Sequence, residues 1–398
     1  LTTTATITDV TTLSVNGDAS IGTDITTSGS QKYQGKVTLT QDVTLKAKNN
    51  ITFEDNATIT GASYNLTLDN DSTHQADYDL KKDVTVKSLT ANIATGKKLS
   101  IPSPVVITAK DGFTVTGAGT VNLGTESQTA DTKIITEKKD INFSGTGTVT
   151  VNSPVILDTT SGTASAIGNI TIKNPFQGKI ADSQPLTIKA GTGNVNLQSD
   201  MGTSVSLGDV TITGKDTTLS QSKELKAKTV SITGAKIQTE QSSKITTAQT
   251  VALTNSDLFL TEKGSVSTAL TGFTKNGTGL SQIAGTVRTN NSAITFNNTT
   301  YIYNASTFDT SNNGAIASPT ADITIGSGTT DDLYISALEG TSPQAVSFTA
   351  RTLDVKGNIV LFNGNVTLKA DIKSGMDIVL LNGNTDNMYD LGGVDDLI

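Results

Sequence analysis

The chain has 398 residues, a formal net charge of −8 and no cysteine, so disulfides and thiolate metal sites are excluded. Aromatic residues make up only 4% of the sequence, tryptophan is absent, and threonine accounts for about one residue in six, far above ordinary usage. This composition argues against a wide globular core, which needs bulky side chains. Only two arginines, Arg288 and Arg351, are present, whereas a phosphate-binding surface is normally basic and rich in arginine, so we do not expect nucleic acid as a partner.

Residues 1–27 are rich in Thr and Ser and have weak strand patterns, and we interpret them as an N-terminal extension or as a capping or pairing strand. From residue 28, short runs such as VTLT, NITF and NLTL restart about every eight to ten residues, with Gly or Asn at nearly every corner. Their apolar residues alternate, which gives each strand one buried and one exposed face. This pattern predicts a main shaft over 28–270.

The sequence changes character near Leu270, where Asn and larger rings become more frequent. We expect residues 271–381 to continue the shaft with longer loops, and residues 382–398 to form an acidic C-terminal cap or tail. No apolar stretch approaches the roughly 20 residues that a membrane span needs.

One pattern, Gly-Asn followed by three strand residues, recurs at 168–172, 193–197, 357–361 and 364–368. Glycine adopts a positive φ at little cost, and asparagine tolerates left-handed geometry and bonds nearby backbone, so both suit corners. The predicted corner glycines are Gly168, Gly193, Gly357 and Gly364. The asparagines expected to stack on successive coils as a ladder of amide hydrogen bonds are Asn169, Asn194, Asn358 and Asn365.

Short strands at regular intervals are compatible with a sandwich, a barrel or a β-solenoid. A sandwich or barrel has a fixed strand number and closes within roughly 100–250 residues. Here the pattern continues without a closing signal, which favours an all-β solenoid.

The stretch SGSQKYQGKVTLTQDVTLKAKNNITFEDNATITGASYNLTLDN at 28–70 resembles the repeats of filamentous-haemagglutinin-like bacterial exoproteins. AGTGNVNLQSDMGTSVSLGDVTITG at 190–214 is similar to a second block of that family, and the likeness covers 28–214 and 350–381. The resemblance implies a right-handed parallel β-helix of the two-partner-secreted or autotransporter type, exported to the cell surface or beyond as an adhesin shaft or fibre. With three strands and roughly 20–30 residues per coil, the chain would form roughly 13–20 coils.

Candidate chemical sites have simple structural interpretations. The single histidine, His74, lies in a polar loop and cannot form a zinc site without cysteines. Asp331–Asp332 and Asp395–Asp396 are adjacent, and neighbours on a strand point to opposite faces, so adjacency does not make a catalytic pair. The segment 382–390 lacks the EF-hand pattern of calcium-binding loops, so we do not expect it to be a calcium site. We therefore expect no catalytic residue, no cofactor and no metal ligand.

Threonine triplets, such as those at 58–60 and 114–116, suggest the surface of an ice-binding solenoid. Their spacing along the sequence is irregular, and Lys, Asn and Asp share the same outward positions. A solvated strand surface is the preferred interpretation.

The rings Tyr301, Tyr303 and Phe308 are either a recognition or interface patch or core fillers where the solenoid changes cross-section. The expected function is that of a structural subunit or shaft of an extracellular bacterial filament. Open sheet edges at the two ends would favour end-to-end pairing of copies.

Two further functions remain open at this stage. The first is an adhesin module whose loops at 70–83, 125–140 and 298–330 bind host or surface glycans or proteins. The second is a polysaccharide-active β-helix enzyme. Loops gathered near an aromatic patch would favour the adhesin module, and a groove of acids and aromatic rings would favour the enzyme.

Overall fold

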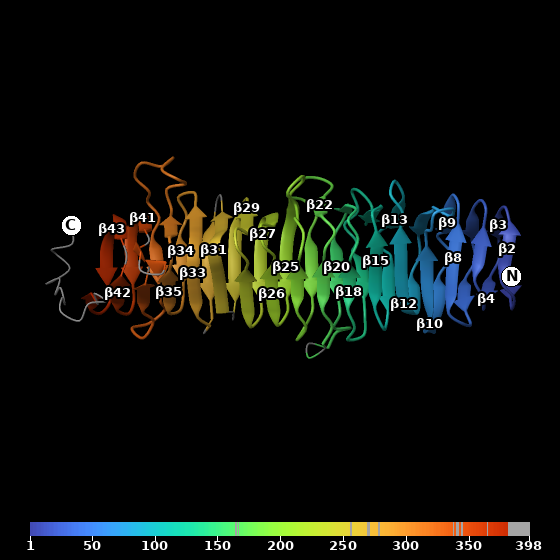
Figure 1. Ribbon diagram of the computed structural model, residues 1–398, viewed down its shortest axis with the longest axis horizontal. Helices are drawn as coiled ribbons and strands as arrows, with labels where there is room; N and C mark the ends of the chain where they lie inside the picture. Colours follow the sequence, from blue (N-terminus) through green and yellow to red (C-terminus); the bar gives the residue numbers. More distant parts are fainter. Residues whose placement is uncertain are drawn as a thin grey trace. The chain divides into compact units, whose positions relative to one another are not determined.

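The described residues of this computed structural model are 1–163, 165, 167–254, 257–268, 271–277, 279–336, 338, 339, 342, 343, 345–363 and 365–380. They contain no helix, and their parallel sheets stack as a β-solenoid of about 16 turns (Figure 1). The parallel β-solenoid predicted from the sequence is therefore confirmed. This part of the chain accordingly offers no helix long and apolar enough to cross a membrane.

The chain divides into two compact units, Leu1–Lys215 (unit 1) and Asp216–Ile398 (unit 2), each described by itself. The boundaries predicted after residues 27 and 270 fall inside these units and stay predictions. The predicted tail at 382–398 lies outside the described residues.

Unit 1 has three walls of parallel strands, and long strands turn a corner and serve two walls. The first wall holds β1 (Thr2–Thr3), β4 (Ala19–Ile21), β7 (Val37–Leu39), β10 (Ile59–Asp69), β12 (Val84–Ile93), β14 (Val106–Ala109), β17 (Thr132–Ile135), β20 (Val155–Asp158), β23 (Leu186–Lys189) and β25 (Leu207–Thr213). The second holds β2 (Ile7–Val10), β5 (Ile25–Thr27), β8 (Val43–Ala47), the second halves of β10 and β12, β15 (Phe113–Gly117), β18 (Ile141–Phe143), β21 (Ile170–Ile172) and β24 (Val195–Leu197). The third holds β3 (Leu13–Val15), β6 (Gln31–Tyr33), β9 (Asn50–Phe53), β11 (Asp77–Leu80), β13 (Lys98–Ile101), β16 (Thr120–Leu123), β19 (Val149–Val151) and β22 (Phe176–Gly178).

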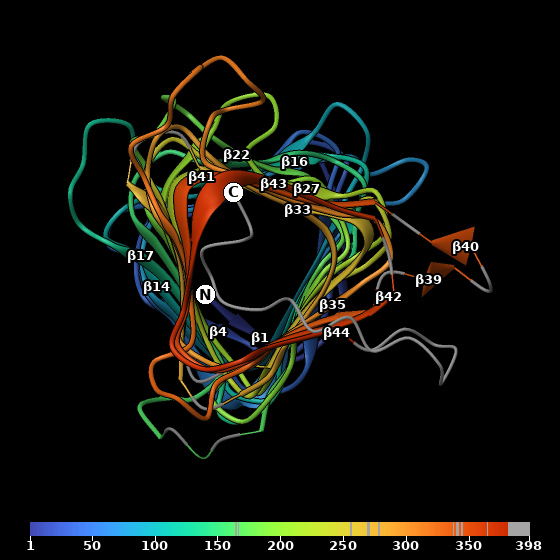
Figure 2. The same cartoon turned by 90° about the vertical axis from the view of Figure 1, so that its left-hand side faces the viewer.

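Unit 2 repeats this plan. Its first wall holds β26 (Asp216–Leu219), β28 (Lys236–Thr239), β31 (Asp257–Thr268), β33 (Ser281–Thr289), β35 (Thr300–Tyr303), β38 (Leu333–Ser336), β42 (Ile359–Asn363) and β44 (Ile378–Leu380). The other two share β27 (Glu224–Thr233), β41 (Ala345–Val355) and β43 (Asn365–Ser374). One of them also holds β29 (Lys244–Thr247), the second halves of β31 and β33, and β36 (Ser306–Asp309). The other also holds β30 (Thr250–Thr254), β32 (Gly272–Asn276), β34 (Ile294–Phe296) and β37 (Ile323–Ile325). Figure 2 shows β35, β42 and β44 on one side of the coils, with the antiparallel pair β39 (Leu338–Glu339) and β40 (Ser342–Pro343) outside them.

The core is a narrow column inside the coils. Inward positions carry mainly Val, Ile and Leu, and alternation gives burial patterns such as that of β8, where Val43, Leu45 and Ala47 are buried. Larger rings stack on successive coils, as Tyr33 does on Phe53 with ring centroids 4.9 Å apart. Because each coil places the same strand position above the last, one residue type can fill the same layer repeatedly.

Coil length is not constant. Bonded positions on neighbouring coils are 18 residues apart at Asp18 and Lys36, but 29 apart at Asp140 and Asn169. The extra residues form loops between walls, and they leave the register of the walls unchanged. Side chains that align in space are therefore unevenly spaced in the sequence.

Candidate functional site

Two of the predicted corner asparagines, Asn169 and Asn358, accept a backbone N–H from the next coil. The Asn169 side-chain oxygen accepts the backbone N–H of Asn194 at 2.9 Å, and the Asp140 carboxylate accepts the N–H of Asn169 at 2.8 Å. In unit 2, Asp332 accepts the N–H of Asn358 at 2.8 Å. Each of these bonds satisfies a corner N–H and ties one coil to the next. We call this contact a corner staple.

Sequence reasoning missed the aspartates that make the same contact. Further corner staples are accepted by Asp18, Asp24, Asp42, Asp77, Asp83 and Asp257. A signal was present, because the acceptor stands at the start of a strand, as in DVTL at 42–45 and DVTV at 83–86. Carboxylates are acceptors only, so Asp suits this position as well as Asn.

The predicted corner glycines serve a different purpose from the expected one. Gly168, Gly193 and Gly357 do not have positive φ angles. A Cβ at Gly193 would lie 2.1 Å from the Gly168 carbonyl oxygen, and one at Gly357 would lie 2.5 Å from the Asp331 oxygen. Close approach of the neighbouring coil, and not φ, therefore requires glycine there.

The last Gly-Asn pair is only partly visible. Gly364 lies outside the described residues. Asn365 begins β43 and pairs with Ala345, and its side chain is not described.

The threonines are more regular in space than in sequence. Thr38, Thr60, Thr85 and Thr108 are cross-strand partners on four successive coils of the first wall of unit 1. A second file on the next wall consists of Thr44, Thr67, Thr90 and Thr114. The outward-facing residues two positions further along these strands are polar or charged and include Asp69 and Asn92. The threonines therefore form single lines across the coils and not the paired rows of an ice-binding surface.

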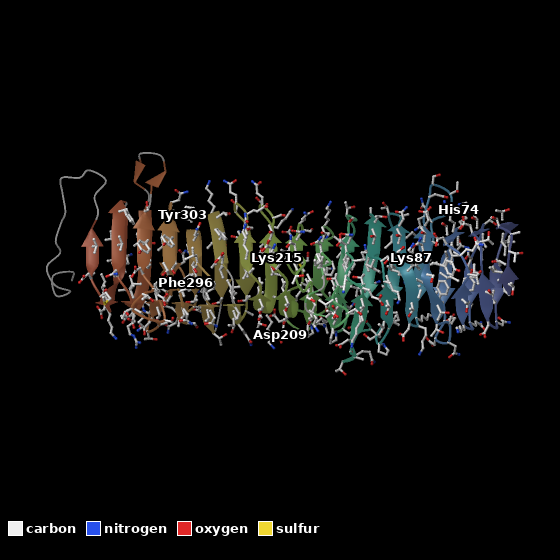
Figure 3. The ribbon with its side chains drawn as sticks, turned by 90° about the horizontal axis from the view of Figure 1, so that it is seen from below. His74, Lys87, Asp209, Lys215, Phe296 and Tyr303 are labelled. Carbon is white, nitrogen blue, oxygen red and sulfur yellow. The ribbon has the colours of Figure 1, made fainter. Side chains whose placement is uncertain are left out.

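The remaining polar candidates hold loops in place. His74 Nδ1 lies 3.1 Å from the Asp71 carboxylate in a loop at the edge of the coils (Figure 3), and Asp71 also accepts the backbone N–H groups of Thr73 and His74. Asp331 accepts the N–H of Ser327 at 2.8 Å and so closes a turn. Among the described residues, no group of three acidic or histidine side chains is placed to hold a metal ion. Asp395 and Asp396 lie outside those residues.

The predicted ring cluster is split between the two faces of its coil. Phe308 is fully buried, with its ring centroid 5.9 Å from Phe296 and 5.0 Å from Phe348. Tyr301 faces outward and is 38% exposed, and Tyr303 is half-buried on the same outer face. Phe308 is thus a core residue, whereas the two tyrosines are on the surface.

Tyr301 belongs to an exposed row of rings on the first wall of unit 2. It pairs in register with Tyr334, and the two rings are stacked with centroids 4.7 Å apart and planes 7° apart. Phe362 follows on the next coil, 6.3 Å from Tyr334 and 37% exposed. We call Tyr301, Tyr334 and Phe362 the aromatic row. Sequence reasoning missed the last two because one coil of variable length separates each ring from the next.

The aromatic row borders a shallow cavity of about 300 Å³. Gln282, Tyr303 and Ser336 contribute polar groups to its lining. The Tyr334 hydroxyl donates to the Asp332 carboxylate at 2.9 Å, and this hydrogen bond to the anion raises the pKa of the Tyr334 hydroxyl. Rings, hydroxyls, an amide and a carboxylate are therefore gathered on one exposed strand surface.

Comparison of the chain with protein-family models, with curated proteins and with solved structures found no match.

Proposed function

We propose that the chain is a structural segment, the shaft of an extracellular bacterial surface filament or adhesin. The observation that carries the proposal is the continuous parallel pairing of each wall. In unit 1, for example, the third wall runs without a break through eight strands, from β3 to β22. Within each unit, strands of successive coils pair along three walls, so a load along the stack is shared by many hydrogen bonds.

The corner staples support this interpretation, because they add bonds between coils at positions where the wall strands end. The solenoid also needs few bulky residues, which explains the low aromatic content. The resemblance of 28–214 and 350–381 to filamentous-haemagglutinin-like repeats is the reason for proposing an extracellular bacterial location.

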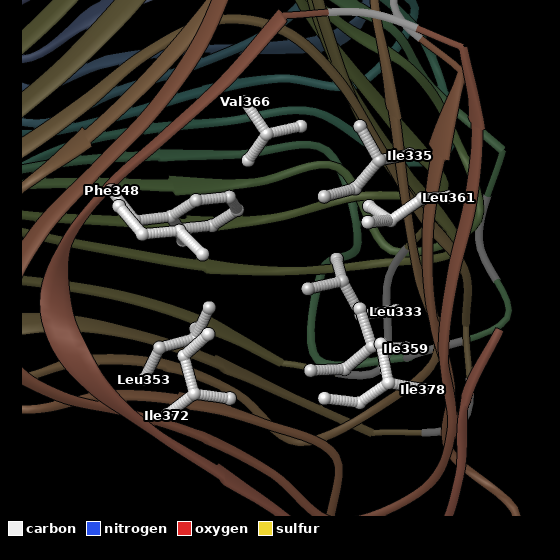
Figure 4. Close-up of a pocket in the computed structure, with 10 residues that line it drawn as sticks. Leu333, Ile335, Phe348, Leu353, Ile359, Leu361, Val366, Ile372 and Ile378 are labelled. Carbon is white, nitrogen blue, oxygen red and sulfur yellow. The ribbon is translucent and has the colours of Figure 1, made fainter. Parts of the chain in front are cut away.

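We further propose that copies associate end to end. Phe348 is fully buried. Its cross-strand partner on the next coil, Leu368, is 37% exposed. Val366, Ile372 and Ile378 also line a small apolar cavity in these last described coils (Figure 4). Where the described residues end, these apolar side chains lie beside strand edges that pair with no further described strand, and such a layer favours stacking of another coil.

Negative-stain electron microscopy of the purified chain at several concentrations tests this proposal. Filaments that lengthen with concentration are expected if copies stack end to end. The Leu368→Asp variant should shorten them, because it places a charge in the stacking layer. Isolated particles at all concentrations would contradict self-association.

A further inference from the structure

We propose that the aromatic row is a binding site for a neutral, extended polysaccharide that lies across successive coils. This activity goes beyond the proposed shaft function. It rests on the strand surface of unit 2 and not on the loops expected at 70–83 and 125–140. The range 298–330, also expected to be a loop, contains strands, and one of them, β35, carries Tyr301 and Tyr303. The inference has three parts: the ring geometry, the free polar groups and the local charge.

The ring geometry leaves apolar ring surface open to a ligand. The Tyr301 and Tyr334 rings are nearly parallel with centroids 4.7 Å apart, so they form a continuous apolar strip across two coils. Tyr301 is 38% exposed and Phe362 is 37% exposed, so both ends of the row are open to solvent. The apolar C–H groups of a sugar ring can pack against such an exposed aromatic strip.

The spacing of the row suits a polymer. Neighbouring coils of a parallel β-solenoid are about 4.8 Å apart, close to the length of one sugar unit in an extended chain. A polysaccharide laid across the coils would meet one ring per coil at Tyr301, Tyr334 and Phe362. A small monosaccharide would contact only one or two rings, so we expect affinity to grow with chain length.

Polar groups beside the rings are free to bind hydroxyls. Within the described part of the chain, the side chains of Gln282, Tyr303 and Ser336 make no hydrogen bond, and all three border the cavity. Gln282 is also the cross-strand partner of Tyr301, so its amide stands at one end of the row. An amide and two hydroxyls provide both donors and acceptors, which neutral sugars require.

The charge beside the row selects against anionic ligands. Asp332 bonds Tyr334, and Asp377 lies on the same edge two coils further, where it donates its N–H to the Asn358 side chain. The cation of Lys236, on β28 three coils before β35, is held over Phe259 with its Nζ 5.0 Å from the ring centroid. A sulfated or uronic-acid polysaccharide would be repelled at the aromatic row.

Affinity electrophoresis of the full chain in gels that contain xyloglucan, galactomannan, mannan or soluble β-glucan tests the proposal. At least one of these neutral polymers should retard the chain, and heparin should not. The Tyr334→Ala variant should weaken polysaccharide affinity about tenfold, which corresponds to about 1.4 kcal/mol, because it removes the central ring and the stacking partner of its two neighbours. Tyr334→Phe keeps the ring and should bind nearly as well as the natural chain.

Tyr64→Ala is the matched control, because it removes a half-buried tyrosine from unit 1. Thermal unfolding of each variant shows whether the fold is kept. Absence of retardation by all four neutral polymers would overturn the proposal, as would equal retardation of the natural chain and a Tyr301→Ala/Tyr334→Ala variant. Preferential binding of heparin, or a monomer–dimer equilibrium that depends on Tyr334 without polysaccharide binding, would equally contradict it.

Discussion

At the scale of single residues, the side chains at the corners decide how coils are joined. An Asp or Asn at the start of a strand accepts a backbone N–H that would otherwise lack a partner, as at Asn169 and Asn194. A hydrogen bond of this type is worth about 1 kcal/mol, because its alternative is a solvated N–H at a constrained corner.

Replacing Asn169 by Ala should therefore destabilise the adjoining coil by about 1 kcal/mol and speed hydrogen exchange at the Asn194 amide about fivefold. Hydrogen exchange followed by mass spectrometry measures this. The Asn169→Asp variant retains an acceptor and should exchange almost normally. Equal exchange in the Ala variant and the natural chain would show that the staple adds nothing.

Inward and outward rings should differ in their contribution to stability. Phe308→Ala is expected to cost about 3–5 kcal/mol, because it leaves a cavity between Phe296 and Phe348. Tyr301→Ala is expected to cost less than about 1.5 kcal/mol, since it removes a surface stack only. Urea midpoints of the two variants test the contrast, and equal losses would contradict the assignment of the two faces.

Asp71 provides a pH-dependent contact at the same scale. Burial alone would raise its pKa, but hydrogen bonds from Thr73, His74 and Lys46 outweigh burial and hold the pKa of the Asp71 carboxyl well below its usual range. A carboxyl with a lowered folded-state pKa contributes stability above its unfolded value, about 3.9, and loses it as pH falls toward the folded value.

The loop at 70–76 should thus remain closed from pH 7 to about pH 4 and open progressively below it. Asp71→Asn should open the loop already at pH 7. Amide exchange in this loop, corrected for the intrinsic pH dependence of exchange, measures both effects. A loop that already opens well above pH 4, or that stays closed at the lowest pH tested, would contradict the role of Asp71.

At the scale of strands, the period-two alternation decides which side chains reach the core. This is why the fold class could be predicted. The sequence did not separate Tyr301 and Tyr303 from Phe308, because they lie on different strands, β35 and β36, and the corner between these strands interrupts the alternation. The register between coils could not be predicted, since loop insertions change the number of residues per coil. Tyr334, Phe362 and the threonine files were hidden for that reason.

Lys275 in β32 is an exception to the apolar interior. It is fully buried, pairs with Leu253 and Phe296 on the neighbouring coils, and its Nζ donates to the Asn276 carbonyl oxygen at 3.1 Å. Burial lowers the pKa of the Lys275 amine. The folded state therefore disfavours the charged form, and this site costs stability at neutral pH.

Lys275→Leu should raise the stability of unit 2 by about 1 kcal/mol or more, because it removes that cost. In the natural chain, stability should rise with pH through the folded-state pKa toward the unfolded value of about 10.4. The variant should lose this rise. Denaturant midpoints between pH 7 and pH 10 measure the difference, and a less stable variant would contradict the argument.

At the scale of the whole molecule, stability in a solenoid comes from contacts between neighbouring coils. In the described part of each unit, strands pair with those of the adjacent coils, so unfolding should proceed coil by coil. A compact domain of the same length would instead unfold in one cooperative step. The shaft function requires the first behaviour, because a load-bearing stack must yield locally without losing all its coils.

Single-molecule stretching of the full chain between its two ends tests this claim most directly. We expect a series of release steps, each a multiple of one coil, which is roughly 60–100 Å of extended chain. One abrupt release of an entire unit at low force would contradict a load-bearing stack of neighbour-bonded coils.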